Sequence, residues 1–320
     1  MFMQRPSNAL HWPWHQLFRK QPYLIAAMSN TLPQLAPQTD TLESLRAGID
    51  RLDDALHDIL MARAEIVTRV GALGAKGAVP LRPGREADII RRLLRRHRGA
   101  LPKRVLPRIW RELLAATTAM QGPYTITVCE VPRASGTDGY ATLTREHFGT
   151  GTPTRVHRSP AQAIAEVSAG TAIAAVLPMP SEQDDSREAW WTALLQRDTP
   201  RIHVVARLPF WSPRAEGAPQ VRALVVSAAA PDRSQHDHTL LGLELSPEMS
   251  RARLSTALTE AGFVTSGILL RRDEHDPRSL LLVDVDGFVT EDDPRLAMLG
   301  TLRPPVVLGA YAMPVDGETP

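Results

Sequence analysis

The stretch Leu45–Gly71, which reads LRAGIDRLDDALHDILMARAEIVTRVG, decides how the first third of the chain folds. Apolar residues recur along it and its flanks at alternating intervals of three and four, namely Leu42, Leu45, Ile49, Leu52, Leu56, Ile59, Ile66, Val70 and Leu73. This spacing predicts one long amphipathic helix with a coiled-coil-like seam. We expect Asp40 and Glu43 to cap its start, and a glycine-rich run before Pro80 to end it.

An arginine occupies one position of this seam. Continuing the spacing from Ile59 leads to Arg63, where an apolar residue is expected. A guanidinium removed from water is costly unless it is paired or liganded. Either Glu65 or Asp58 pairs with Arg63 in a structural role, or Arg63 binds an anionic ligand.

Two more helices are expected downstream of a loop that reads AKGAVPLRPG. The first runs from about residue 85 to 98 and the second from about 103 to 121, where Gly122-Pro123 closes the helical region. Thr117 and Gln121 fall on one face of the last helix, one turn apart. Together with arginines 46, 63 and 85 and with Glu86, they would suit a small polycarboxylate.

Composition narrows the classes of partner. The formal net charge is +2, which gives the chain no strong field for a polyanion, and no apolar run is long enough to span a membrane. Only three of the 37 basic residues are lysines, so arginine forks dominate the positive charge. The arginine-rich stretch 82–111 is interpreted as a solvated helical face rather than a nucleic-acid surface, because no binding motif accompanies it.

The sequence changes character after residue 123. Strand-like runs such as YTITVCEV and TAIAAVLPM alternate with a helical stretch, which predicts an α/β domain over about 125–230. The last eighty residues predict a helix over 247–261, several strands and a short helix near 294–302, forming a small α+β unit. Trp190 and Trp191 are interpreted as core aromatics.

The helical region resembles the all-helical chorismate mutase domain that opens many bifunctional chorismate mutase–prephenate dehydratases. The matching text is LRAGIDRLDDALHDILMARAEIVTRVG, then RPGREADIIRRL, then IWRELLAATTAMQ. The resemblance implies an intertwined homodimer in which Arg46 reaches the partner's site and Arg63 clamps a substrate carboxylate. It implies that Arg85 and Glu86 surround the substrate hydroxyl, that Thr117 lines the site, and that Gln121 lies near the breaking ether oxygen.

The implied reaction, chorismate to prephenate, is an intramolecular rearrangement that needs no nucleophile, proton relay, metal or cofactor. An enzyme need only hold the dianion in its reactive conformer and stabilise charge on the ether oxygen. One departure from the family concerns its lysine, because Gly74 occupies the position that spacing from Arg63 assigns to it. Either Lys76, two residues on, takes that role, or the site lacks its cationic donor to the ether oxygen.

The remainder resembles the dehydratase and ACT regulatory parts of the same enzymes in degenerate form. QVRALVV stands where the family has Thr-Arg-Phe, so Val221 replaces the threonine taken to be catalytic, and Arg222 is retained. A valine has no hydroxyl to donate. The resemblance therefore implies that dehydratase activity is lost and that the chain ends in an ACT-like, ferredoxin-like unit.

These inferences give a multidomain α plus α/β architecture. The expected parts are a linker extension (1–40), a mutase domain (41–122), a dehydratase-like domain (123–232) and an ACT-like domain (233–320). The single cysteine, Cys129, excludes an internal disulfide and favours a reducing cytoplasm. His236 and His238 lie in an expected loop without a third ligand, so we expect no metal.

The leading hypothesis is a cytoplasmic chorismate mutase of phenylalanine and tyrosine synthesis, with chorismate as its small-molecule partner and neither nucleic acid nor membrane. The alternatives are a non-catalytic regulator that binds an aromatic amino acid or a partner enzyme, and an active bifunctional enzyme.

Overall fold

The structure is a computed structural model that describes residues 41–73, 79–130, 139–185, 188–196, 198–212, 214, 216–246, 249–273 and 276–317. The chain divides into two compact units, Met1–Leu73 and Gly74–Pro320. The first unit contributes a single described helix, and the second contains a large sheet with its covering helices.

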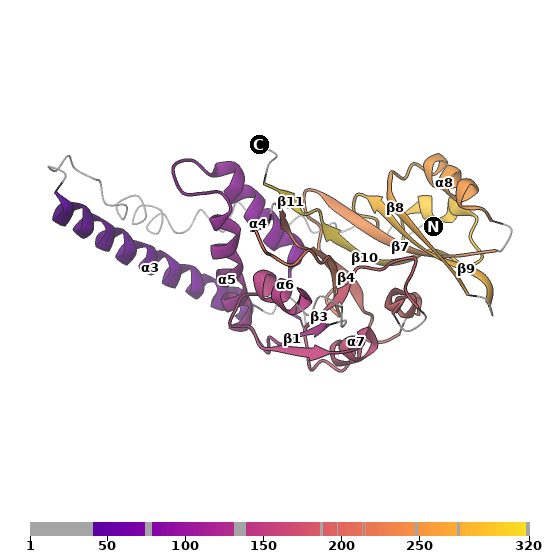
Figure 1. Ribbon diagram of the computed structural model, residues 1–320, viewed down its shortest axis with the longest axis horizontal. Helices are drawn as coiled ribbons and strands as arrows, with labels where there is room; N and C mark the ends of the chain where they lie inside the picture. Colours follow the sequence, from indigo (N-terminus) through magenta and orange to yellow (C-terminus); the bar gives the residue numbers. More distant parts are fainter. Residues whose placement is uncertain are drawn as a thin grey trace, which may run out of the picture. The chain divides into compact units, whose positions relative to one another are not determined.

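The first unit confirms the long helix, α3 (Leu42–Ala72) (Figure 1). The expected cap is wrong, because Thr41 and Ser44 form the capping box rather than Asp40 and Glu43. Thr41 Oγ1 accepts from the Ser44 N–H at 3.2 Å, and Ser44 Oγ accepts from the Thr41 N–H at 3.1 Å. Two backbone donors at the helix start are thereby satisfied. Asp40 lies outside the described residues.

The apolar seam of α3 is exposed. Six of its side chains keep 42–65% of their surface accessible, namely Leu42, Leu45, Ile49, Leu52, Leu56 and Ile66. A row of large apolar side chains in water marks an interaction surface rather than ordinary surface variation.

The second unit is built on a nine-stranded sheet in the order β2-β1-β3-β6-β4-β10-β7-β9-β8 (Figure 1). Its strands are β1 (Ile126–Cys129), β2 (Thr154–His157), β3 (Ala174–Pro178), β4 (His203–Leu208), β6 (Ala223–Ser227), β7 (Asp237–Leu245), β8 (Thr265–Asp273), β9 (Asp276–Asp286) and β10 (Val306–Ala312). The strands β5 (Trp211–Ser212) and β11 (Val315–Asp316) pair separately.

Helices cover both faces of the β1–β3 half. Alternate residues of β1 divide between two cores: Ile126 packs with α6 (Gly139–Phe148), whereas Cys129 packs with α7 (Pro160–Ser168). The 3₁₀ helix η2 (Trp190–Leu195) adds Trp190 and Trp191 to the second core, confirming that they are core aromatics. Parallel pairing of β1 with both β2 and β3 is consistent with the α/β texture of the sequence.

The other half of the sheet has the strand order β10-β7-β9-β8, with α8 (Arg251–Glu260) between β7 and β8 and η3 (Pro294–Leu299) before β10. In chain order this is 4-1-3-2, the order of a ferredoxin-like unit. The predicted helix over 247–261 begins later, because Ser250 is the N-cap and accepts from the Arg253 N–H. The predicted helix near 294–302 ends at Leu299, where Gly300 adopts a left-handed φ of 59°.

The two compact units divide the chain after Leu73, so the predicted boundaries at 122 and 232 both fall within the second unit, and the domain assignment stays a prediction. The sheet continues across the second boundary, because β10 pairs with both β4 and β7. The two shorter helices, α4 (Pro83–Arg96) and α5 (Val105–Ala119), belong to the unit that contains the sheet. All four of their ends lie within two residues of the predicted ends, and Pro83 suits the first turn of α4.

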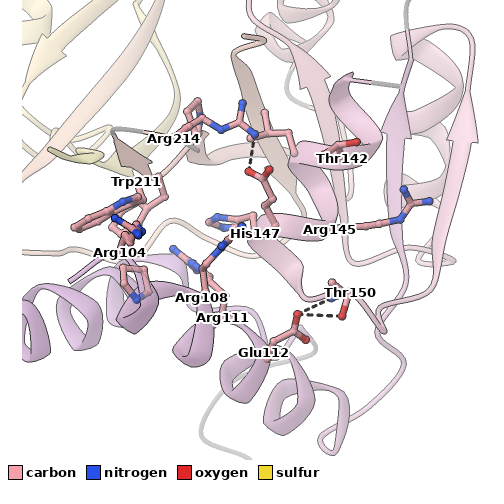
Figure 2. Close-up of a pocket in the computed structure, with 15 residues that line it drawn as sticks. Arg104, Arg108, Arg111, Glu112, Thr142, Arg145, His147, Thr150, Trp211 and Arg214 are labelled. Carbon is pink, nitrogen blue, oxygen red and sulfur yellow. Dashed lines mark hydrogen bonds and ion pairs between the residues drawn. The ribbon is translucent and has the colours of Figure 1, made fainter. Parts of the chain in front are cut away.

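Side-chain contacts attach α5 to α6 (Figure 2). The Glu112 carboxylate accepts hydrogen bonds from the Thr150 N–H at 3.0 Å and from the Thr150 hydroxyl at 3.1 Å, just beyond the end of α6. Gly149 allows this approach, since a Cβ there would lie 2.9 Å from the same carboxylate and its φ is 87°.

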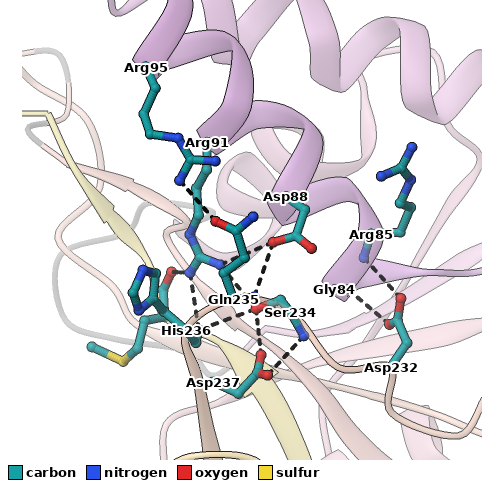
Figure 3. A network of polar contacts seen from close by, with 11 residues as sticks. Gly84, Arg85, Asp88, Arg91, Arg95, Asp232, Ser234, Gln235, His236 and Asp237 are labelled. Carbon is teal, nitrogen blue, oxygen red and sulfur yellow. Dashed lines mark hydrogen bonds and ion pairs between the residues drawn. The ribbon is translucent and has the colours of Figure 1, made fainter.

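A second set of contacts attaches α4 to the segment before β7 (Figure 3). The N-cap residue of α4, Arg82, makes no side-chain cap. Instead the Asp232 carboxylate accepts from the backbone N–H groups of Gly84 and Arg85, each at 2.9 Å. A Cβ at Gly84 would lie 2.3 Å from the Asp232 carbonyl oxygen, so only glycine permits this close approach. A carboxylate from 148 residues away thus performs the capping role.

Arg91 extends the same network. Its guanidinium donates to Ser234 Oγ at 3.0 Å and to the backbone carbonyls of His236 and Met313, and its side chain is only 9% exposed. The expected solvated face of 82–111 is therefore wrong for Arg91, whose charge is satisfied inside the protein. Burial lowers the pKa of Arg91, and Asp88 and Asp237 offset part of that effect.

Replacing Asp232 by alanine is expected to destabilise the second unit. Loss of a helix cap costs about 0.5–2 kcal/mol. For a unit of this size each kcal/mol corresponds to a fall of roughly 2–4 °C in the unfolding midpoint. Thermal unfolding followed by circular dichroism measures it, with exposed Asp292→Ala as the matched control. An unchanged midpoint in Asp232→Ala would show that the cap contributes nothing.

Cys129 is expected to be unreactive in the folded chain. Its side chain is fully buried, and burial, reinforced by Glu130 and Glu188, raises the pKa of its thiol to about 12. Burial disfavours the charged form, so at pH 8 roughly one thiol in 10⁴ is the reactive thiolate. Ellman's reagent should label the native chain negligibly and label the thiol fully after guanidinium unfolding. Rapid labelling without denaturant would contradict this burial.

Candidate active site

The resemblance places Glu86 at the substrate hydroxyl, and the structure shows what it contacts within its own unit. Glu86 Oε2 accepts from Arg111 Nη1 at 2.8 Å, with both side chains largely buried. The Arg111 guanidinium also lies 4.8 Å from the centre of the Phe210 ring. Burial lowers the pKa of Arg111 and Glu86 opposes that shift, whereas burial and then Glu86 raise the pKa of Tyr124. The pair joins α4 to α5 and gives a buried charge a partner.

Sequence reasoning missed Arg111. It was included among the solvated arginines, but its side chain is only 7% exposed. The signal that could have found it is its place on the apolar face of α5, seven residues before Thr118, which is also buried. Its partner is 25 residues distant, so sequence spacing alone does not pair the two.

The remaining predicted residues of the second unit lie at the ends of their helices. Arg85 is exposed in the first turn of α4, and its backbone N–H is bound by Asp232. Gln121 follows the end of α5, and its Nε2 donates to the Thr117 carbonyl at 2.8 Å. The structure therefore brings Gln121 and Thr117 together and places Glu86 against Arg111.

Two predicted residues belong to α3 in the first unit. Arg46 is exposed near the helix start, whereas Arg63 is half-buried farther along it. Burial lowers the pKa of Arg63. Water screens the attraction between opposite charges, and a partly buried arginine is screened less than an exposed one. Arg63 is therefore well suited to bind an anion. Gly74 and Lys76 lie outside the described residues, so the lysine assignment stays a prediction.

The dehydratase-like region carries an acidic group at the start of α6. The Glu130 carboxylate accepts from the Ala141 N–H at 2.9 Å and from the Tyr140 N–H at 3.3 Å. These are the donors that a helix N-terminus would otherwise offer to an anion. Val221, the valine in place of the family's threonine, packs against the first core. Its Cγ1 would lie 3.0 Å from a Cβ at Gly139, the first residue of α6.

The histidines considered for metal binding are not both in a loop. His238 lies in β7, where Nδ1 is 3.0 Å from Asp284 and Nε2 is 3.2 Å from Asp286. Both ring nitrogens are thus engaged by carboxylates. In the part of the chain that the structure describes, no group of three histidine, cysteine or acidic side chains could hold a metal ion. None of the described helices combines the length and apolarity needed to cross a membrane.

Comparison with known proteins identifies the helical segment. Residues 45–122 match the family model described as chorismate mutase type II. The individual proteins that match this part of the chain carry more specific names than the family model does. The segment and its surroundings match proteins named "Bifunctional chorismate mutase/prephenate dehydratase", which agrees with the resemblance seen in the sequence.

Two of these relatives illustrate the extent of the match. The protein from Aquifex aeolicus is 31% identical over 87 residues, covering 26% of this chain and 24% of that protein. The protein from Stutzerimonas stutzeri is 25% identical over 167 residues, covering 50% of this chain and 45% of that protein. The matches thus span less than half of these relatives' length.

Two solved structures are also similar. One, described as "GqqA- a novel type of quorum quenching acylases", has 18% identity and a TM-score of 0.45, covering 60% of this chain and 96% of that one. The other is a prephenate dehydratase from Arthrobacter aurescens in complex with L-Phe, with 17% identity and a TM-score of 0.41, covering 59% and 90%.

Proposed function

We propose that this chain is a chorismate mutase that rearranges chorismate to prephenate. The observation that carries the proposal is the family match over residues 45–122, a range that contains Arg46, Arg63, Arg85, Glu86 and Gln121. The rearrangement is intramolecular, so catalysis consists of holding the compact conformer and stabilising charge on the ether oxygen. An arginine guanidinium binds a carboxylate through two parallel hydrogen bonds. Such bidentate contacts suit the task of holding the substrate in its compact conformer.

Each residue has a defined part in this proposal. Arg63 clamps one substrate carboxylate from the seam of α3, where its partial burial strengthens the contact. Gln121 donates to the ether oxygen, and Lys76 supplies the cationic donor that Gly74 cannot. Rotation of the Gln121 amide away from the Thr117 carbonyl, which it now contacts, frees this donor.

The proposal includes a homodimer built on α3. Burial of the exposed apolar seam would stabilise the protein. The α3 helix of a second copy has a matching apolar seam of the same length. Full burial of one leucine or isoleucine contributes roughly 1.5–3 kcal/mol, so six seam residues provide a strong drive to pair. Arg46 lies on the same exposed helix and would reach the partner's site.

The proposed enzyme acts on chorismate in the cytoplasm and has no dehydratase activity. Val221 has no hydroxyl to donate, and the Glu130 carboxylate occupies the N–H groups at the start of α6. Incubation of the purified chain with chorismate, followed by nuclear magnetic resonance, should show prephenate accumulating as the end product. Persistence of chorismate throughout would refute the mutase function.

Prephenate given directly to the chain is expected to yield no phenylpyruvate, even in the variant Val221→Thr. The restored hydroxyl would still face a helix N-terminus that Glu130 has neutralised. Phenylpyruvate absorbance in base measures the product, with a bifunctional relative as the positive control. Phenylpyruvate formed by the wild type above the spontaneous rate would instead indicate an active bifunctional enzyme.

A second candidate function is a non-catalytic regulator that binds an aromatic amino acid. It is favoured by the Glu86–Arg111 pair, which already engages the carboxylate assigned to the substrate hydroxyl, and by the glycine at position 74. A rise in the unfolding midpoint with phenylalanine, combined with no turnover of chorismate, would identify it.

A further inference from the structure

A pocket of about 390 Å³ opens between α5, α6 and the segment after β4 (Figure 2). The residues of its lining that matter here are Arg104, Arg108 and Arg111 on one side, Phe210 on the floor, and Trp211 and Arg214 on the other side. None of the residues assigned to the mutase reaction lines it. Its volume falls in the range of sites for small organic ligands.

The pocket holds an excess of positive charge. Arg104, Arg108 and Arg111 extend from α5 on one side, and Arg214 lies on the other (Figure 2). Among the described residues, Arg104 and Arg108 have no hydrogen-bond or ion-pair partner. Both residues are exposed at the rim of the pocket, where their guanidinium donors can bind a carboxylate.

The acidic residues of the lining do not neutralise these two arginines. The Glu146 carboxylate accepts from Arg214 Nη2 at 2.6 Å. The Glu112 carboxylate accepts from Thr150. His147 adds no charge, because burial, followed by the nearby Arg111, lowers its pKa well below the ordinary value.

The far side of the pocket offers two more donors. The indole N–H of Trp211 and the Nε–H of Arg214 are buried, and neither has an acceptor among the described residues. Buried donors are normally satisfied, and a donor left without an acceptor is costly. Both donors belong to residues of the pocket wall, so an acceptor carried by a ligand would satisfy them.

The floor between the two ends is apolar and aromatic. Phe210 is stacked by the Arg111 guanidinium on one face, and the His147 ring lies 6.5 Å away in an edge-on arrangement. Leu143 and Pro209 complete this surface. Such a floor fits a ring rather than an aliphatic chain.

We propose that this pocket binds a small ring-bearing dicarboxylate. One carboxylate binds Arg104 and Arg108 on α5, the ring packs on Phe210, and the second carboxylate accepts from Trp211 and Arg214. Arg111 lines the pocket and donates a hydrogen bond to Glu86. A ligand bound in the pocket would therefore also affect Glu86, a residue assigned to the mutase reaction. That coupling rests on the proposed mutase function, whereas binding itself does not.

Isothermal titration calorimetry with terephthalate tests the site, since this rigid ring carries a carboxylate at each end. The full chain carrying Arg63→Ala is used throughout, so that the mutase site does not contribute. We expect saturable binding, with benzoate and inorganic phosphate at least about tenfold weaker because each lacks one part of the match.

The variant Arg104→Gln/Arg108→Gln should raise the Kd for terephthalate at least about tenfold. The control Arg92→Gln/Arg253→Gln removes the same charge from exposed positions outside the pocket and should leave the Kd within twofold. Absence of saturable binding, equal affinity for phosphate, or an unchanged Kd in Arg104→Gln/Arg108→Gln would each overturn the proposal. Because calorimetry needs no turnover, an inactive mutase would not be mistaken for an empty pocket.

Discussion

Replacing Arg63 by alanine is expected to lower kcat/KM for chorismate by about 10²–10³-fold. The guanidinium is half-buried on the seam of α3, and its removal would leave a substrate carboxylate without its proposed bidentate partner. The loss should appear in both kcat and KM, since the clamp holds the ground state and the reactive conformer. Steady-state kinetics by chorismate absorbance measure it.

The matched control is Arg69→Ala, which removes an exposed arginine from the last turn of the same helix. It should keep activity within about threefold. Arg63→Lys should recover only part of the loss, because an ammonium lacks the planar fork. Retention of wild-type kcat/KM by Arg63→Ala would mean that Arg63 has a structural role only.

The double variant Ile49→Glu/Leu56→Glu is expected to convert the dimer to a monomer and to abolish mutase activity. Both side chains are more than half exposed on the α3 seam, and carboxylates there would repel each other across a symmetric pair. Activity falls with assembly because each site would lose the Arg46 of its partner. Light scattering after size exclusion measures the mass.

The control for the dimer is Asp53→Ala, an exposed position between the two seam residues. It should leave both mass and activity unchanged. A wild-type chain that is monomeric at micromolar concentration, yet fully active, would contradict the proposed assembly.

The sequence pattern predicts the local features of this protein well. The three-four spacing identifies α3, because a helix with one apolar face is specified by neighbours one turn apart. Gly99 and Pro102, residue types that disfavour a helix, lie between α4 and α5, and strand-like runs in the sequence predict much of the sheet. Each of these depends on residues close in the sequence.

Contacts between distant residues could not be predicted in the same way. The cap of α4 comes from Asp232, and Arg91 is satisfied by Ser234 and two carbonyls more than 140 residues away. Because these partners anchor α4 to the segment before β7, α4 belongs with the sheet rather than with α3. From the sequence alone, an arginine-rich helix is predicted to be solvated, because its distant partners cannot be identified.

The candidate site shows the same division. The sequence motifs shared with the family are the basis for assigning site roles to Arg46, Arg63, Arg85, Glu86, Thr117 and Gln121. The pairing of Glu86 with Arg111, in contrast, depends on how α4 packs on α5. The pocket beside that pair combines α5, α6 and Trp211, three parts of the chain with no shared sequence motif. Only the folded arrangement reveals it.

The most direct test of the central claim is a progress curve of chorismate absorbance in the ultraviolet with the purified wild-type chain. The mutase proposal predicts a decay that scales with protein concentration, leaves prephenate as product and is lost in Arg63→Ala. A decay no faster than that of chorismate alone, in wild type and variant alike and across a range of pH, would contradict it.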